Sequence, residues 1–599
     1  MKKNLFIALT FMLGSCNILD KQPLDTISDN TLWNDEALVT AYLYDLYANT
    51  PVFVNDASAV GWDPYSTDIV GMFYVNELSD ECYYGWNFYN RPHIIKYKGG
   101  DLKVDGGLME YWELPYKTIR KANDLIERMS MSTLSDDFRK QMIAEARFVR
   151  AFNYFAMVKR YGGVPLITQV QNMTDSEEVL YPKRNSEKEI YDFIIKEMEE
   201  VAPDLPEEIP TSQKGKPDKY TALALQSRAA LYAGSIAKYG KVQLDGLLGI
   251  PADKANEYFE ISYKASKKII DDGKYALYQG DADKSINFRN IFLVEDNSEC
   301  IFVKKYDGIP NGGVVWDYDF SQCPKPHSWG AGQKNSPYLE MVESFERIDG
   351  TSGKLNYEEL ESKLWTLDEL WGGRDPRFYA TIWTEGTPWQ GSTVGFYKGI
   401  ITENGETIVD GSYKGVPACG SQTLGNQNFY TSFGVLKYLD ESSNNVSREM
   451  AYSKTDYIVF RLGEIYLNLS EAAYELGKTE EALNALNVIR ERAGMPDKTT
   501  IDMETIRAER KVELAFEGHR YWDLKRWRIA EEKLTGGNTG IKYELDYATR
   551  KYKITVIKNV EESYGDGSRS PLFLSHHYYF PITLGRTGAN PNLVENPGY

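Results

Sequence analysis

The sequence predicts a mostly α-helical protein with small β elements, folded as one intertwined body. Apolar residues recur at helical spacing in several separate segments, which is typical of amphipathic helices. Residues 463–494 read as two antiparallel helices joined near Gly477. Between about 275 and 455 the composition changes, and Gly, Pro, Asn and Trp become frequent. This change predicts an irregular insertion between two helical blocks, in which only short strands can form.

Single helices are expected at several places along the chain. The periodic segments that predict them are 35–48, 112–123, 144–161, 218–238 and 256–272. Gly162 can cap the third of these helices, and Pro165 prevents its continuation. In the helix pair at 463–494, small residues occur at the spacing of tetratricopeptide hairpins, although a generic helical hairpin would show a similar pattern.

Two segments predict strands. Residues 299–306 (ECIFVKKY) can form one short strand, and residues 541–558 alternate well enough for a β-hairpin that turns at Ala548 and Thr549. Residues 50–107 show no period, which predicts a long connection. The many aromatic residues in this connection argue against disorder.

The N-terminus predicts export and lipidation. The chain opens with a basic head, an apolar run at 5–13 and two small residues before Cys16, which is the pattern of a secretory signal. The run is too short to cross a bilayer, which needs about 20 apolar residues. Cys16 after small residues resembles the lipobox of bacterial lipoproteins. That resemblance implies a signal peptide at 1–15, a triply acylated (palmitate-bearing) Cys16 as the first mature residue, and a lipidated tether at 16–28. The alternative is an ordinary signal peptide with a chance cysteine.

The net charge and the composition of the chain make some classes of binding partner unfavourable. The formal net charge is −19, and loss of residues 1–15 would make it −21, because two lysines and no acid are removed. A field of that sign disfavours DNA, RNA and anionic lipid as partners. The four cysteines after Cys16 lie far apart without a C-x-x-C, so they cannot form a disulfide framework. Aromatic residues make up 13% of the chain, more than a core needs, so some are expected to face a ligand.

The sequence carries no signature of metal or nucleophilic chemistry. The five histidines form no H-E-x-x-H, no cysteine pair has zinc spacing, and neither a G-x-S-x-G elbow nor a Walker-type loop occurs. We therefore expect no catalytic residue, no metal and no cofactor. The paired carboxylates of a glycosidase stay open, because their spacing is spatial rather than sequential.

A charged segment near the C-terminal third allows two interpretations. Glu517 and His519 could act as an acid and a base. One continuous helix would instead place four residues of alternating charge on one face: Arg510, Glu513, Glu517 and Arg520. Such a face predicts a ladder of ion pairs with a structural role.

Several segments together resemble one protein family. They are 144–151 (AEARFVRA), 160–167 (RYGGVPLI), 510–524 (RKVELAFEGHRYWDL), the Arg526–Trp527 pair, and 590–593 with 596–599. Residues 20–23 (DKQP) and 373–377 (GRDPR) are similar to further parts of the same pattern. With the lipobox, these segments resemble the SusD/RagB family of outer-membrane nutrient-binding lipoproteins, along the whole chain and in order. Small departures occur at 581–583 and 594–595.

The resemblance implies a SusD-like fold, mostly α, of tetratricopeptide-like helix pairs with a loop-rich, partly β cap. Residues 29–599 would form a single body. Its helical core is expected at roughly 29–274 and 456–535, with the loop-rich insertion at roughly 275–455 and a C-terminal hairpin and tail at 536–599.

The resemblance also implies a function. The protein would be a surface-facing, lipid-anchored component of the outer membrane of a Gram-negative bacterium. It would bind nutrient glycans and deliver them to a SusC-like TonB-dependent transporter, without being an enzyme. One alternative is a peptide-binding lid of the RagB type, and an alternative from another class is a surface glycoside hydrolase.

Exposed aromatic residues of the irregular regions are the expected ligand contacts, because flat rings can stack on sugars while neighbouring amides bind hydroxyl groups. The candidate ligand-binding residues are Trp62, Tyr65, Trp86, Asn87, Tyr89, Trp316, Tyr318 and Trp329. The alternative is that these rings pack the irregular regions onto the helical core.

Overall fold

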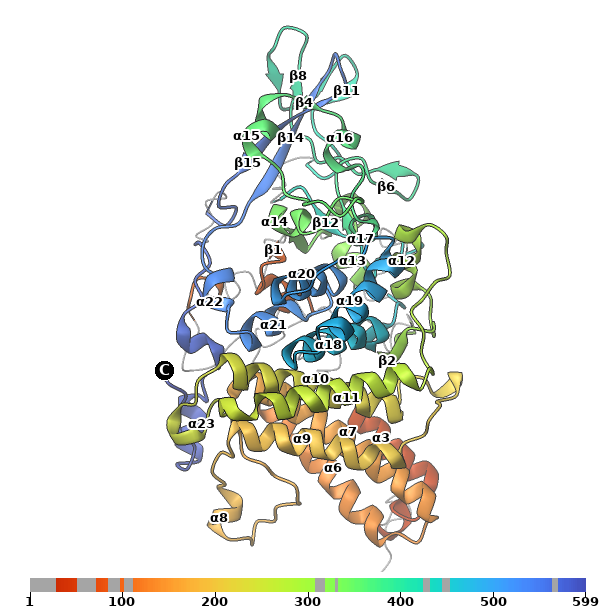
Figure 1. Cartoon of the computed structure of the whole chain (residues 1–599), viewed down its shortest axis with the longest axis vertical. Coiled ribbons are helices and arrows are strands. Elements are labelled where there is room, and N and C mark those ends of the chain that lie inside the picture. Colours follow the sequence, from red (N-terminus) through yellow and green to blue (C-terminus); the bar gives the residue numbers. More distant parts are fainter. Residues whose placement is uncertain are drawn as a thin grey trace, which may run out of the picture.

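The computed structural model describes most of the chain. The described residues are 29–50, 72–84, 97–101, 111–307, 318–328, 332–423, 431–443, 453–562 and 569–599. The predicted signal peptide and Cys16 lie outside these ranges. Figure 1 shows helices stacked across the lower and middle parts of the molecule, with a β-rich tip above them.

Consecutive helices pack as antiparallel neighbours. The stack comprises α3 (Glu36–Ala48), α6 (Glu113–Met131), α7 (Asp136–Tyr161), α9 (Glu187–Val201), α10 (Lys219–Tyr239), α11 (Ala255–Asp271), α18 (Leu462–Glu475) and α19 (Thr479–Ala493). Along this series α6 packs on α7, α7 on α9, α9 on α10, α10 on α11, α11 on α18, and α18 on α19. The predicted fold of helix pairs is therefore confirmed (Figure 1).

Local signals place the helix boundaries. The Asp35 carboxylate accepts hydrogen bonds from two backbone N–H groups in the first turn of α3, which satisfies donors that the helix cannot use. Helix α7 ends at Gly162, whose φ is 70°. A Cβ there would lie 2.3 Å from Leu248, so both the backbone conformation and the close contact require glycine.

The charged segment predicted as one helix is in fact interrupted. Helix α20 (Met503–Glu513) ends before α21 (Arg520–Arg526) begins. The break contains two residues with positive φ, Phe516 at 59° and Gly518 at 76°, which an α-helix cannot contain. The predicted continuous face of four charged residues is therefore wrong.

The cap is built from short helices and short strands. Its helices are α12 (Lys284–Leu293), α13 (Tyr318–Gln322), α14 (Leu339–Glu343), α15 (Tyr357–Ser362), α16 (Leu367–Trp371) and α17 (Pro376–Thr381). Its small strand pairs are β1 (Cys82–Tyr84) with β3 (Asn335–Pro337), β5 (Ile382–Trp383) with β12 (Gly434–Val435), β6 (Pro388–Trp389) with β7 (Ser392–Thr393), and β10 (Ser412–Tyr413) with β11 (Val416–Pro417). The remaining short helices are α2 (Asp29–Leu32), α4 (Met72–Glu77), α8 (Glu177–Leu180), α22 (Ala530–Lys533) and α23 (Leu584–Ala589).

One sheet joins the insertion to the C-terminal part of the chain. The predicted hairpin is confirmed as β14 (Gly540–Asp546) and β15 (Tyr552–Ile557). It forms the centre of a five-stranded sheet of order β4-β15-β14-β8-β9, in which β14 pairs in parallel with β8 (Ile400–Ile401). The outer strands are β4 (Leu364–Trp365) and β9 (Thr407–Ile408), and the sheet forms the tip in Figure 1.

Another strand pair anchors the cap to the helices. The strand predicted at 299–306 is confirmed as β2 (Cys300–Lys304), which pairs antiparallel with β13 (Tyr457–Arg461). Aromatic rings of α7 pack against this pair, with Phe148 5.5 Å from Phe302 and Phe152 6.1 Å from Phe460 between ring centroids. The hydrophobic core thus runs from the helices into the cap.

Glu385 makes a pH-dependent contribution to the stability of the cap. Its carboxylate accepts hydrogen bonds from the backbone N–H groups of Phe396 and Tyr397 and from the hydroxyl of Tyr552. Burial raises the pKa of Glu385 to about 7. Since the unfolded pKa is about 4.3, the folded protein holds an extra proton between these values, and stability falls as the pH rises through them.

We therefore expect Glu385→Gln to stabilise the protein progressively as the pH rises. Glutamine can keep all three contacts, because its oxygen accepts the two N–H groups and its amide donates to Tyr552. Relative to the wild type, the free energy of unfolding should gain about 2–3 kcal/mol between pH 5 and pH 8, measured by urea unfolding. The exposed Glu358→Gln should show no such trend. A difference between Glu385→Gln and wild type that stays constant over this pH range would contradict the prediction.

Candidate ligand-binding site

Two segments that carry predicted ligand contacts connect to paired strands: one begins after β1, and the other ends before β3. Trp86, Asn87 and Tyr89 follow β1 in the chain, and Trp329 precedes β3. These strands pair antiparallel, with Tyr84 opposite Asn335. The pairing therefore brings together two points that are far apart in the sequence. One is the start of the segment that contains Trp86, and the other is the strand that follows Trp329.

Helix α13 is fixed to the same strands. It starts directly after the segment that contains Trp316, and its last residue, Gln322, exchanges two hydrogen bonds with Asn335 of β3, at 2.8 and 3.2 Å. We call β1, β3 and α13 together the loop platform. Three chain segments that carry predicted ligand contacts connect directly to this platform.

The buried carboxyl group of Glu77 is hydrogen-bonded to the loop platform. The side-chain amide of Asn335 donates to Glu77 Oε1 at 2.8 Å, and Glu77 is fully buried at the end of α4. Burial raises the pKa of Glu77 well above its usual value, against the opposing charges of Lys98 and Lys334. Buried polar contacts of this kind fix one arrangement of the chain, because breaking them leaves unsatisfied groups.

Most of the predicted ligand contacts lie outside the described residues: Trp62, Tyr65, Trp86, Asn87, Tyr89, Trp316 and Trp329. Tyr318 is described, and it is 3% exposed, with its hydroxyl donating to the carbonyl of Lys437 and its ring 5.9 Å from that of Tyr438. A ring in this position cannot stack on a sugar. For Tyr318 the structure therefore supports the alternative of a packing residue.

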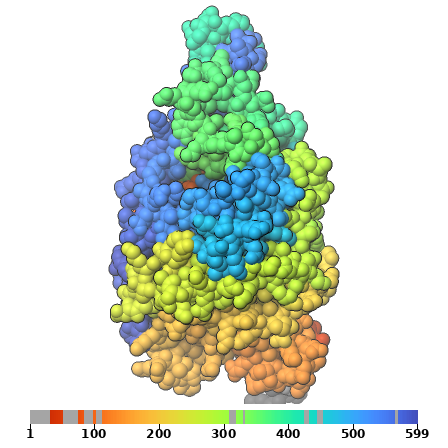
Figure 2. Space-filling view, in the orientation of Figure 1, coloured from red at the N-terminus to blue at the C-terminus, as the bar shows by residue number. Residues whose placement is uncertain are grey.

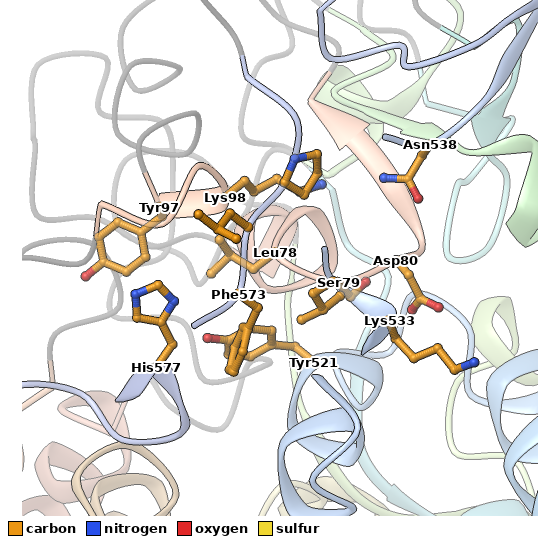
Figure 3. A pocket seen from close by; sticks show the side chains of 13 residues that line it. Leu78, Ser79, Asp80, Tyr97, Lys98, Tyr521, Lys533, Asn538, Phe573 and His577 are labelled. Atoms are coloured by element: carbon orange, nitrogen blue, oxygen red, sulfur yellow. The ribbon is translucent and has the colours of Figure 1, made fainter. Parts of the chain in front are cut away.

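A pocket lies beside the loop platform. It has a volume of about 470 Å³, including the solvent at its mouth, and Figure 3 shows the side chains around it. The lining residues are Leu78, Ser79, Asp80, Tyr97, Lys98, Tyr521, Lys533, Leu534, Asn538, Pro571, Leu572, Phe573 and His577. Their mixture of aromatic, aliphatic and polar groups is typical of small-molecule sites. Sequence reasoning missed this pocket because its walls come from five separate parts of the chain.

Polar groups of the pocket are already engaged with the protein. Lys98 Nζ donates to the hydroxyl of Tyr338 at 2.8 Å, and that hydroxyl donates to Glu561 at 2.7 Å. Burial alone would raise the pKa of Asp80, but ion pairs with Arg520 and Lys511 outweigh it and hold the pKa well below its usual range. Asp80 is thus ionised and paired, which does not suit a catalytic acid.

The charged residues near position 517 pair with other elements rather than with one another. We define the central ion-pair cluster as the connected buried charges Glu299, Arg377, Lys437, Arg461, Arg492, Glu513 and Glu517. Outside this cluster, Arg510 pairs with Asp523 at 2.8 Å and Arg520 with Asp80 at 2.7 Å. The predicted structural role is retained, but the predicted partners are wrong, because the helix breaks between α20 and α21.

Glu517 and His519 are unsuited to acid–base chemistry. Glu517 is 5% exposed and accepts charged hydrogen bonds from Arg461 and Lys437, which hold its pKa below the usual value although burial opposes them. Burial, with nearby arginine charges, lowers the pKa of His519 well below its usual value. A catalytic acid and base work best with pKa values near the working pH, and the pKa of both groups is shifted downward, away from neutral pH.

The described part of the chain has neither a metal-binding cluster nor a membrane-spanning helix. Within the described ranges, no group of three or more His, Cys, Asp and Glu side chains could hold a metal ion. Among the described cysteines, Cys82, Cys300, Cys323 and Cys419 form no disulfide. None of the helices in the part of the chain that the structure describes is long and apolar enough to cross a membrane.

Comparisons with known proteins match the chain over nearly its full length. The model of the SusD family matches residues 298–599, and a second model, described as starch-binding associating with outer membrane, matches residues 19–231. A SusD-like protein, P38, of Formosa agariphila is 24% identical over 89% of this chain and 93% of its own. The starch-binding protein SusD of Bacteroides thetaiotaomicron is 22% identical over 88% of this chain and 85% of its own.

A solved structure shows the same fold. The crystal structure of a SusD-like protein from Bacteroides fragilis covers 97% of this chain and 100% of its own, with a TM-score of 0.72 and 27% sequence identity. Its agreement with the helix stack and the cap described above, together with a family model that covers half of the sequence, establishes that this chain is a member of the SusD family.

Proposed function

We propose that this protein binds nutrient glycans at the outer-membrane surface and delivers them to a SusC-like TonB-dependent transporter. An acylated Cys16 would anchor it, and the protein would be no enzyme. The observation that carries the proposal is the loop platform, because it gathers the ends of three segments that carry predicted aromatic contacts, in a member of a glycan-binding family. The name of the Bacteroides thetaiotaomicron relative, a starch-binding protein, supports a glycan as the ligand.

The non-catalytic part of the proposal is supported by the chemistry of the acidic residues. Ion pairs with arginine and lysine outweigh burial and hold the pKa of Glu513 and of Glu517 below its usual value, and Asp80 in the pocket is paired with two cations. A glycoside hydrolase needs one protonated carboxyl group beside one ionised carboxylate at the sugar. The acids of this cluster and Asp80 do not provide that combination.

Incubation of the mature protein with a glycan panel tests the proposal. We expect soluble starch, mixed-linkage β-glucan, arabinoxylan or pectin to bind without release of shorter products, measured by calorimetry and by chromatography of the supernatant. Product release would identify a hydrolase instead, and binding of peptides but of no glycan would identify a peptide-binding lid. Co-purification from outer membranes with a TonB-dependent transporter tests the proposed partner.

A further inference from the structure

We propose that Asp319 is a positioning residue of the ligand-binding site, whose carboxylate holds two other chain segments onto the start of α13. This inference rests on the proposed function. Asp319 is the second residue of α13 and is 1% exposed. It therefore acts from inside the protein, within α13 of the loop platform, and not by contact with a ligand.

Three hydrogen bonds make this attachment. Asp319 Oδ1 accepts from the backbone N–H of Asp440 at 2.8 Å, and Oδ2 accepts from Ser443 Oγ at 2.8 Å. The backbone N–H of Asp319 donates to Ser453 Oγ at 2.8 Å. Ser443 and Ser453 stand immediately before and after residues 444–452 in the sequence. One residue thus fixes both ends of that stretch to the helix that follows Trp316.

The last residue of α13 is fixed to β3, another element of the loop platform. Gln322 exchanges hydrogen bonds with Asn335 of β3, and the hydroxyl of Tyr318 donates to the carbonyl of Lys437. Helix α13 is therefore a rigid connection between the β1–β3 pair and the 437–443 segment. Its position determines where the neighbouring segments leave the core, and binding groups must be held within about 0.5 Å of their productive geometry.

The surroundings of Asp319 differ from those of the acids in the central ion-pair cluster. Glu513 and Glu517 are buried with arginine partners, whereas no lysine or arginine among the described residues forms an ion pair with Asp319. Burial raises the pKa of Asp319 to about 6, and the nearby Asp440 carboxylate adds to this effect. A buried carboxylate that only neutral donors hold costs stability.

Two substitutions of the mature protein separate positioning from packing. Asp319→Ala removes both carboxylate contacts, so we expect affinity for the most tightly bound panel glycan to fall about tenfold, with faster hydrogen exchange at 437–443 and 453–457. Asp319→Asn keeps the geometry, because its oxygen can accept from Asp440 and its amide can donate to Ser443. We expect Asp319→Asn to bind within about twofold of the wild type.

A matched control is Glu187→Ala in the helix stack. Glu187 is also a buried carboxylate that accepts two hydrogen bonds, from the Gly249 N–H at 2.7 Å and the Tyr579 hydroxyl at 2.6 Å. This variant should lose stability but keep the affinity. Wild-type affinity or unchanged exchange in Asp319→Ala would overturn the proposal, as would failure of Asp319→Asn to restore binding. If the wild type bound no glycan, the proposed function would fail, and hydrogen exchange would still decide whether Asp319 holds these segments.

Discussion

Replacement of Arg461 by alanine is expected to lower the free energy of unfolding by about 3–5 kcal/mol. All five N–H donors of an arginine can form hydrogen bonds, and in Arg461 they bind Glu299, Glu513 and Glu517 at 2.7–2.9 Å. These three acids are at most 5% exposed, so loss of the guanidinium group leaves negative charges buried without their central partner.

Chemical unfolding of the variant and wild type measures this loss as a shift of the urea midpoint. The control is Lys117→Ala, which breaks an exposed ion pair with Glu113 on α6 and should change stability by less than about 1 kcal/mol. A loss below about 1 kcal/mol in Arg461→Ala would mean that the central ion-pair cluster rearranges or takes up water when its central arginine is removed.

Trp86→Ala is expected to weaken glycan binding by about tenfold or more, which corresponds to about 1.4 kcal/mol. Stacking of a base on an aromatic side chain, a comparable contact, contributes about 1–3 kcal/mol. Trp86 follows β1 in the chain, and β1 pairs with β3, the strand that follows Trp329 in the sequence. Stability should change little, because an exposed ring contributes little to a core.

The matched control is Trp527→Ala. Trp527 is 1% exposed, and its indole N–H donates to Glu471 at 2.8 Å, so its loss should cost about 3–5 kcal/mol of stability and leave the affinity unchanged. Calorimetric titration measures the glycan affinity of both variants, and urea unfolding measures their stability. Together the two measurements show whether Trp86 contacts the ligand or packs in the core. If Trp86→Ala behaved like Trp527→Ala, Trp86 would be a packing residue.

The elements that could be predicted are those whose formation depends on residues that are close together in the sequence. The helix pair α18–α19, the end of α7 at Gly162 and the β14–β15 hairpin are confirmed, because periodicity, capping and alternation are properties of neighbouring residues. The continuous helix through Glu517 is wrong, because its charges find partners on distant elements and the backbone turns at Phe516 to reach them.

The candidate site was less predictable for the same reason. Aromatic composition suggested candidate segments, which stay a prediction, and nothing local reveals that β1 pairs with β3 or that Asp319 binds Ser443. Tyr318 shows the limit of composition as a guide. A tyrosine in an aromatic-rich segment can be exposed or buried, and only the three-dimensional packing places this ring inside.

The five-stranded sheet of the cap has a consequence for biosynthesis. Its strands β4, β8 and β9 come from the middle of the chain, but they pair around β14 and β15, which are made near the end. A ribosome delivers the N-terminal helices first, so these can pack while the middle strands still present unpaired edges. The tip can close only when the last strands are available, and pairings of such long range form slowly. A polypeptide that stops before Gly540 would keep those edges open and be prone to aggregate.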